Sequence, residues 1–201
     1  MNRPEAMQAS LTPREWMMEW WPILKELNEE LLARVDPWDL ETIRDAVPDP
    51  SWLGYPGASA AAVEEAEARL GLRFPETYRS LLDVSNGWQG AAGFPNGIAS
   101  LLPVEALRWL REDRMREHER FREYLRERPE LLAPGPTVVD LLDRLLLVGD
   151  CDGNELLLLV VSARTDDWPV IGWDPEDGFW QREGLEALFR DELAALRRER
   201  R

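Results

Sequence analysis

The chain has 201 residues, of which 44% are hydrophobic, and this suits one well-cored domain with a helical extension better than two independent domains. Its formal net charge of −15 repels phosphate backbones and argues against direct nucleic-acid binding. The single cysteine, Cys151, excludes an internal disulfide and a cysteine-based zinc site, and the longest apolar run, 156–161, is too short to cross a membrane. We therefore expect a cytoplasmic protein that does not insert into membranes.

Residues 1–56 are predicted to form a helical extension that packs on a main domain of residues 57–201. Thr12 is a good N-cap and Pro13 suits the first helical turn, so a helix should begin there, and Pro22 should kink or divide it. Trp16, Trp20 and Trp21 form either an exposed aromatic docking surface for a partner or part of a face buried against the chain's own core. We favour burial, because helices are stabilised mainly by tertiary packing. The apolar stripe of this helix contains Trp16, Trp20, Ile23, Leu24, Leu27 and Leu31, with Trp21 beside it.

The clearest pattern lies in residues 59–87, which predict two helices joined by a tight corner. Ser59 is a good N-cap for the first helix, and Gly71 can take the left-handed conformation that ends it. Pro75 opens the second helix, and Asn86-Gly87 tolerates the positive φ that closes it. Each helix carries an apolar stripe, made of Val63, Ala66 and Leu70 in the first and of Tyr78, Leu81 and Leu82 in the second.

These residues resemble the signature of the SUKH superfamily, which includes the yeast Smi/Knr cell-wall synthesis regulators and many bacterial immunity proteins. Any amphipathic helical hairpin would share the apolar stripes, but it would not need Phe-Pro, then Tyr, then Asn-Gly at these offsets. The resemblance implies a protein that binds a partner rather than one that catalyses a reaction. The residues that carry it are Val63, Ala66, Glu67, Leu70, Gly71, Leu72, Phe74, Pro75, Tyr78, Leu81, Leu82, Asn86 and Gly87.

The middle of the chain departs from the family pattern. Residues 98–102 are predicted to form a strand, and residues 103–128 a helix that ends before Pro129. Arg and Glu alternate over 111–128, which is typical of a solvated helix with charge pairs between successive turns. Relative to the family, this charged helix looks like an insertion.

The second half predicts an antiparallel sheet. Two continuous apolar runs, 145–148 and 156–161, flank a turn and should form a hairpin that is covered on both faces. Residues 168–173 should add a strand, 179–180 a short partner strand, and 185–196 a final helix. The sequence therefore predicts an α+β fold in which a mainly antiparallel sheet is covered by the helices of 59–84 and by the C-terminal helix, next to the helical extension.

We find no constellation of reactive residues and expect no catalytic, metal-binding or cofactor-binding residues. Asp150, Asp152 and Asn154 match the first three spacings of a calcium loop, but the glycine and glutamate that the rest of the loop needs are missing. Cys151 could be activated by only one histidine, His118, from a separate helix. A hydrolase that uses two of the 39 acids stays open, although nothing singles out a pair.

The leading hypothesis, implied by the resemblance, is a bacterial immunity protein that binds and neutralises a cognate toxin. The alternative is a regulatory or scaffold protein like the yeast relatives. An acidic rim would steer a basic toxin, for example a nuclease, and exposed tryptophans would anchor it, although the same acidity would serve solubility alone. For Trp88, an aromatic clamp under its own loop is at least as good an interpretation as a partner contact. The predicted partner-binding residues are Trp88, Asp150, Asp152, Asp166, Asp167, Trp168, Trp173, Asp174, Glu176 and Asp177.

Overall fold

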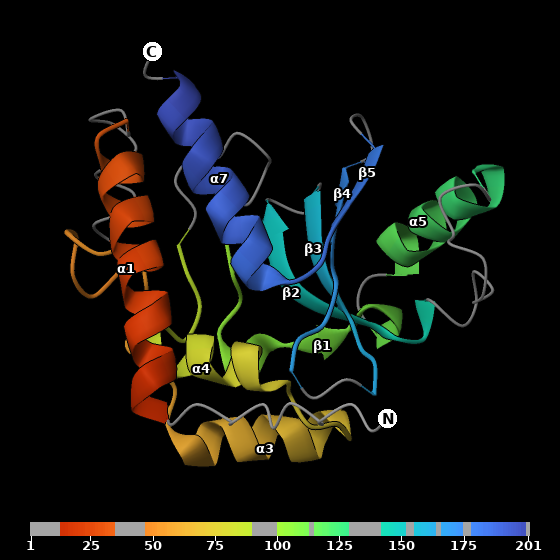
Figure 1. Cartoon of the computed structure of the whole chain (residues 1–201). Coiled ribbons are helices and arrows are strands. Elements are labelled where there is room, and N and C mark those ends of the chain that lie inside the picture. Colours follow the sequence, from red (N-terminus) through yellow and green to blue (C-terminus); the bar gives the residue numbers. More distant parts are fainter. Residues whose placement is uncertain are drawn as a thin grey trace, which may run out of the picture.

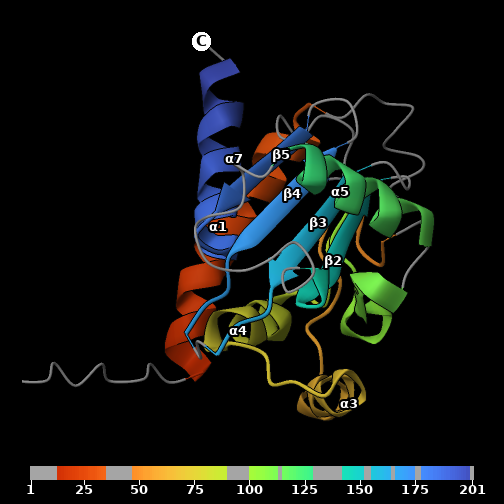
Figure 2. The same cartoon turned by 90° about the vertical axis from the view of Figure 1, so that its right-hand side faces the viewer.

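The structure is a computed structural model that describes residues 13–34, 47–89, 100–112, 115–128, 142–151, 155–163, 166–174 and 178–199. Within these residues an antiparallel sheet is covered by helices on both faces (Figures 1 and 2), which confirms the predicted α+β class. The helical elements are α1 (Pro13–Leu32), α3 (Ala60–Leu70), α4 (Glu76–Val84), α5 (Met115–Glu127) and α7 (Leu185–Glu199), with the 3-10 turns η1 (Val104–Ala106) and η2 (Leu110–Glu112).

The strands of the sheet lie in chain order, β1-β2-β3-β4-β5, and every neighbouring pair is antiparallel. The predicted hairpin is present as β2 and β3, with a bulge at Val148, because Leu147 pairs with Leu158 while Gly149 already pairs with Leu157. The five strands are β1 (Arg108–Trp109), β2 (Leu145–Cys151), β3 (Glu155–Val160), β4 (Val170–Asp174) and β5 (Gly178–Arg182).

Both faces of the sheet are buried, each against its own set of helices. Successive side chains of a strand point to opposite sides, so one strand contributes to both cores. In β3, Leu157 and Leu159 belong to the core that contains α1, α3, α4 and α7, whereas Leu158 packs with Phe121 and Leu125 of α5. Figure 2 shows this arrangement, with α5 in front of the sheet and α1 and α7 on the other side. Coverage on both faces explains why β2 and β3 are apolar at nearly every position. The helix interpreted as a solvated insertion is therefore also the cover of one sheet face.

Helix α1 packs against α4 and α7 (Figure 1). Trp20 meets Phe189 of α7 edge-on, with 5.7 Å between ring centroids. The helix continues through Pro22, so of the two predicted effects, a kink or a division, the division is wrong and the kink stays a prediction. Pro22 is exposed, and a carbonyl that loses its helical partner on the solvent side can bond to water instead. The described side chains of the predicted stripe, Trp20, Ile23, Leu24, Leu27 and Leu31, are buried, and the side chain of Trp16 lies outside the described part.

The predicted helix of residues 103–128 is broken in its first third, which forms η1, β1 and η2. The reason is tertiary: the guanidinium of Arg69 in α3 takes the carbonyls of Leu107 (2.8 Å), Val104 (3.2 Å) and Glu105 (3.3 Å), which a continuous helix would use internally. The adjacent residues 108–109 instead pair with the free edge of β2. None of the described helices is long and apolar enough to span a membrane.

Single bridges continue the sheet beyond β2. Gly149 bridges Leu101, Leu101 bridges Trp88, and Trp88 bridges Gly54, all antiparallel. Leu101 is the part of the predicted strand 98–102 that forms sheet contacts, while residues 98 and 99 lie outside the described residues. The bridges connect the segment before α3 to the central strands.

Candidate functional site

A hollow of about 610 Å³ lies at the corner between α3 and α4. One wall is the connection between these helices together with the first turns of α4, and the other wall is the segment after β3. The two walls are about 90 residues apart in the chain, as the bonds between residues 77 and 166 show, so only the folded chain forms the hollow. Its lining includes Arg73, Phe74, Glu76 and Arg79 on one side and Ser162 and Trp168 on the other.

Satisfied helix ends fix the direction of this corner. Ser59 Oγ accepts a hydrogen bond from an amide in the first turn of α3 (3.2 Å), as predicted for the N-cap. Gly71 has a φ of 67°, and the amides of Gly71 and Leu72 donate to the carbonyls of Ala68 (3.3 Å) and Glu67 (3.1 Å). This pair of bonds is the Schellman motif, which satisfies the last carbonyls of a helix. The chain therefore leaves α3 in one defined direction.

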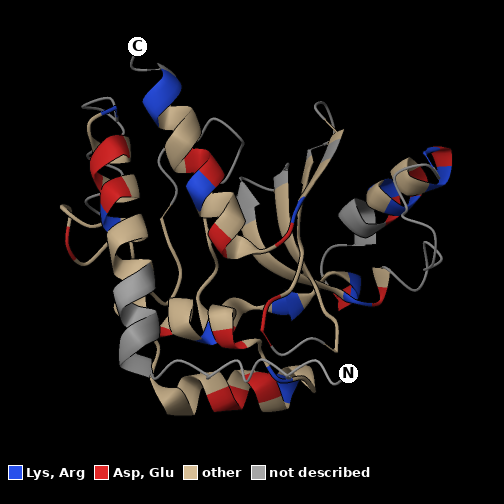
Figure 3. Ribbon diagram, viewed as in Figure 1, with Lys and Arg blue, Asp and Glu red and all other residues tan. Residues whose placement is uncertain are grey.

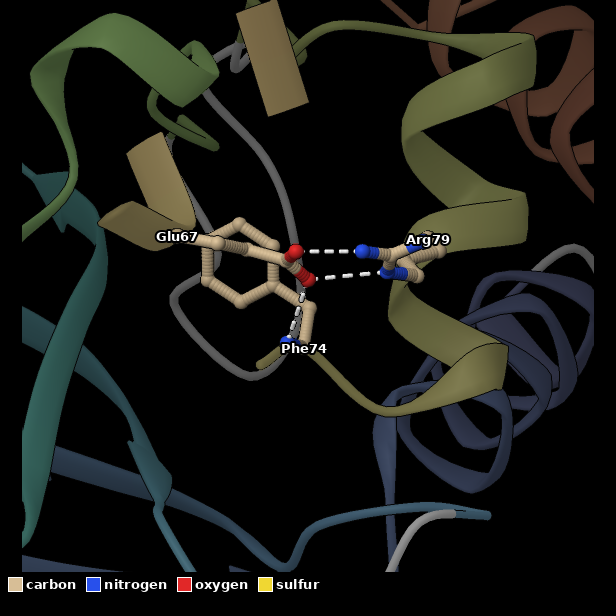
Figure 4. A network of polar contacts seen from close by, with 3 residues as sticks. All are labelled: Glu67, Phe74 and Arg79. Atoms are coloured by element: carbon tan, nitrogen blue, oxygen red, sulfur yellow. Dashed lines mark hydrogen bonds and ion pairs between the residues drawn. The ribbon is translucent and has the colours of Figure 1, made fainter. Parts of the chain in front are cut away.

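Glu67 joins the two helices across the corner (Figure 4). Its carboxylate accepts a hydrogen bond from the Phe74 amide (2.7 Å) and a bidentate contact from Arg79, through Nε (2.8 Å) and Nη2. Charge-assisted bonds of this kind are stronger and more directional than neutral ones. Hydrogen bonding to Glu67 raises the pKa of the Arg79 guanidinium. A permanent cation, about a third exposed, therefore stands at the edge of the hollow.

The second wall is attached to the first turn of α4. The carbonyl of Asp166 accepts hydrogen bonds from the amide (3.2 Å) and the hydroxyl (2.5 Å) of Thr77. The carboxylate of Asp167 accepts a bond from the Trp168 amide (2.8 Å). Three of the predicted partner-binding residues, Asp166, Asp167 and Trp168, are thus brought together beside the hollow.

The predicted acidic rim is divided between two ends of the sheet. Strands β2 and β4 run in the same direction, so Asp150 and Asp174 lie at the end where both strands finish. Asp166 and Asp167 lie in the β3–β4 connection, at the opposite end. The described acids of the predicted rim therefore do not form one patch, because the connections of an antiparallel sheet alternate between its ends. The remaining predicted acids, Asp152, Glu176 and Asp177, lie outside the described residues.

The three predicted anchors, Trp88, Trp168 and Trp173, are buried, with 1%, 1% and 3% of their surface exposed. The expectation that they are exposed is wrong, because each indole fills space in the core of its own chain. Trp88 packs edge-on against Trp52 (5.1 Å between centroids), and Trp173 against Phe121 (5.5 Å). In this conformation their indoles stabilise the fold and are not available to a partner.

The adjacent residues Trp20 and Trp21 differ in burial, because Trp20 lies in the core and Trp21 lies at the surface. Trp20 is 2% exposed, and its Nε1 donates to the Thr77 carbonyl (3.2 Å) and to Ser80 Oγ (2.9 Å). Trp21 is 51% exposed and stacks on Trp52, with 5.0 Å between centroids. Sequence reasoning weighed Trp21, with Trp16 and Trp20, as a docking surface, favoured burial, and did not include it among the partner-binding residues. Its position off the helical period was the signal that could have found it.

Tyr78 is a buried titratable residue next to Phe74, which lines the hollow. Tyr78 packs edge-on against Phe74 (5.2 Å), and burial raises the pKa of its hydroxyl above the ordinary value of 10.0. His118 lies in α5, and Cys151 ends β2. Within the described ranges, no group of three or more His, Cys, Asp or Glu residues is placed to hold a metal ion.

Comparison with known families gives one result for most of the chain. The family model described as SMI1 / KNR4 family (SUKH-1) matches residues 57–191. The matched segment contains the α3–α4 corner and all five strands, whereas α1 precedes it. A search of curated proteins finds no match.

Proposed function

The chain belongs to the SMI1/KNR4 family (SUKH-1), and from this membership we propose that it is a non-catalytic protein-binding domain that serves as a bacterial immunity protein. In this role it binds a cognate toxin stoichiometrically and blocks it. The family membership is the observation that carries the proposal, because both the immunity proteins and the yeast regulators of this superfamily are understood as proteins that bind other proteins.

The distribution of charge supports a basic partner. The net charge is −15, and Figure 3 shows carboxylates along α1 and α3, where Glu26, Glu64 and Glu65 are exposed. Opposite net charges steer two proteins together and raise their association rate. A toxin that acts on nucleic acid needs a basic surface for its substrate, so an acidic protein that covers this surface would compete with the substrate.

Coexpression with the toxic protein encoded beside this gene tests the proposal. We expect the full chain to restore growth of the bacterial host, and we expect the two purified proteins to form a stable complex. Unimpaired killing would reject the immunity function. If instead no toxic protein is encoded nearby and the chain co-purifies with proteins of cell-wall synthesis, the regulatory function of the yeast relatives is the correct one.

A further inference from the structure

A second hollow, of about 620 Å³, lies between α1 and the segment of residues 49–52. We call it the Trp21–Trp52 shelf. Its lining shares no residue with the hollow at the α3–α4 corner, and α1 lies outside the segment matched by the family. Its lining includes the aromatic pair Trp21 and Trp52, the apolar Leu32, and the charged residues Lys25, Glu29 and Asp49.

Buried contacts hold the shelf in place. Asn28 of α1 is buried, and both ends of its amide are used: Nδ2 donates to the Ser51 carbonyl (2.9 Å), and Oδ1 accepts from the Leu53 amide (2.9 Å). Gly54 leaves room for the indole of Trp52, since a Cβ at this position would lie 2.5 Å from Trp52 Nε1. Trp52 is therefore fixed between α1 and the core, and Trp21 stacks on it with an interplanar angle of 29°. A surface fixed in this way loses little conformational entropy when it binds.

The chemistry of the shelf suits a planar cation. Aromatic rings attract a guanidinium to their faces, and nearby carboxylates add charge attraction and hydrogen-bond acceptors. The Asp49 carboxylate accepts bonds from the Ser51 hydroxyl (2.6 Å) and amide (2.9 Å), which lower its pKa and keep it charged. Glu29 is paired only loosely with Lys25, at 3.9 Å, and both side chains are mostly exposed.

The chain itself places arginine side chains over partly buried aromatic rings. Within the described residues three guanidinium groups lie over aromatic rings, and none of these three lies over Trp21. They are Arg111 on Trp109 (4.8 Å), Arg128 on Tyr124 (4.3 Å) and Arg182 on Trp180 (5.2 Å). Trp21, the exposed large hydrophobic residue of the described chain, thus offers the same kind of surface to another molecule.

We propose that the Trp21–Trp52 shelf is a docking site for an arginine side chain of a basic protein partner. This inference rests on the proposed function and gives it the aromatic anchor that the buried Trp88, Trp168 and Trp173 cannot supply. A second copy of the chain is a poorer occupant, because two molecules that each carry a charge of −15 repel one another. Tryptophan and arginine are also the residues that most often dominate the energy of protein interfaces.

A titration of the isotope-labelled full chain tests the chemistry without the partner. The probe is Nα-acetyl-argininamide, compared with the lysine and glutamine analogues, and the readout is the indole N–H signals of Trp21 and Trp52 in NMR spectra. We expect saturable shifts with the arginine probe. Trp21→Ala should weaken its binding about fivefold, and Asp49→Asn should weaken it less, because the aromatic face supplies most of the attraction. The matched control Glu65→Gln, an exposed α3 carboxylate, should leave it unchanged.

Two results of this titration would overturn the proposal. The first is a shift no larger with the arginine probe than with the glutamine analogue. The second is equal binding of the lysine and arginine probes, since the site would then recognise charge without stacking a guanidinium.

The neutralisation assay with the toxin separates this inference from the proposed function. If the wild type neutralises the toxin and Trp21→Ala binds it about tenfold more weakly, the shelf is the anchor. If both neutralise it equally, the shelf is rejected and the immunity function stands. If the wild type does not neutralise any candidate, the immunity function fails, and the probe titration alone decides the arginine site. A dimer that Trp21→Ala dissociates in sedimentation would assign the shelf to self-association and reject the proposal.

Discussion

Trp20 and Trp21 show how strongly one step along a helix changes the role of a residue. The side chain of Trp20 points into the core and makes two hydrogen bonds, whereas that of Trp21 is half exposed. Truncation of a buried tryptophan removes contacts and leaves a cavity, so Trp20→Ala should lower the free energy of unfolding by about 3–5 kcal/mol. Trp21→Ala should lower it by about 1 kcal/mol, the value of one aromatic stack. Urea denaturation of both variants checks this difference, and equal losses would contradict it.

Tyr78 makes the free energy of unfolding fall as the pH rises in the alkaline range. Burial holds the pKa of its hydroxyl above 10.0 in the folded chain, so the unfolded chain releases this proton first as the pH rises. The stabilisation that comes from the protonated Tyr78 hydroxyl is fully present below pH 10. Above pH 10 the free energy of unfolding falls by about 1.4 kcal/mol for each further pH unit.

Replacing Tyr78 by Phe should therefore flatten the alkaline loss of stability while changing stability at pH 7 little. Denaturant titrations of the wild type and Tyr78→Phe at a series of pH values from neutral to above 10 measure this difference. Parallel curves for the two proteins would show that other groups cause the alkaline loss.

At the scale of elements, the α3–α4 corner depends on one left-handed residue. Gly71 has a φ of 67°, and apart from its chain neighbours no residue comes within 4 Å of the position that a Cβ would occupy. The effect of Gly71→Ala is therefore purely that of backbone strain, about 1–2 kcal/mol of stability. Gly71→Asn should lose clearly less, because asparagine tolerates this conformation better. Thermal or urea unfolding of the two variants measures the difference, and equal losses would mean that the strain lies elsewhere.

The elements that the sequence predicts well are those fixed by local signals. Ser59, Gly71 and the continuous apolar runs of β2 and β3 act within a few residues of themselves, so patterns alone locate the helices of the corner and the central hairpin. The first third of the 103–128 helix is lost because the distant Arg69 takes its carbonyls. Periodicity carries no information about such long-range contacts.

The candidate site was predicted less well, for the same reason. Glu67 and Arg79 lie on different helices, and no spacing rule links them, although they form the ion pair at the hollow. Trp88 has the composition of an interface anchor, but single bridges to Leu101 and Gly54 bury it. Composition indicates which residues can bind a partner, whereas the fold decides which of them are exposed.

For the whole molecule, the extent of the family match and the extent of the core differ. The match begins at residue 57, yet five of the side chains described in α1 are buried in the core that also contains α3, α4 and α7. The division of the chain at residue 56 stays a prediction. If α1 is part of one cooperative unit, a chain that starts at residue 47 exposes the apolar surfaces of α4 and α7 against which α1 packs.

We expect this shortened chain to lose its cooperative unfolding transition. Each buried apolar side chain of α1 contributes about 1.5–3 kcal/mol, and five of them together rival the whole stability of a typical domain. Calorimetry of the shortened chain, with and without an added peptide of residues 13–34, measures the effect. A shortened chain that unfolds at the temperature of the full chain would show that α1 is an independent appendage.

The rate at which a partner associates depends on the net charge of the molecule and on where that charge lies. Two pairs of substitutions separate these effects: Asp150→Lys with Asp174→Lys at one end of the sheet, and Glu64→Lys with Glu65→Lys on α3. In each pair two acids become two bases, so the net charge rises by four, from −15 to −11.

If the toxin approaches the sheet end, the first pair should slow association about tenfold at low salt, whereas the α3 pair should slow it about twofold through net charge alone. Both effects should shrink as salt screens the charges. Stopped-flow association with the toxin measures these rates. Equal rates for the two pairs would show that the acids at the sheet end do not steer the toxin and serve only solubility. The Trp21–Trp52 shelf would then be the proposed binding determinant that is still to be tested.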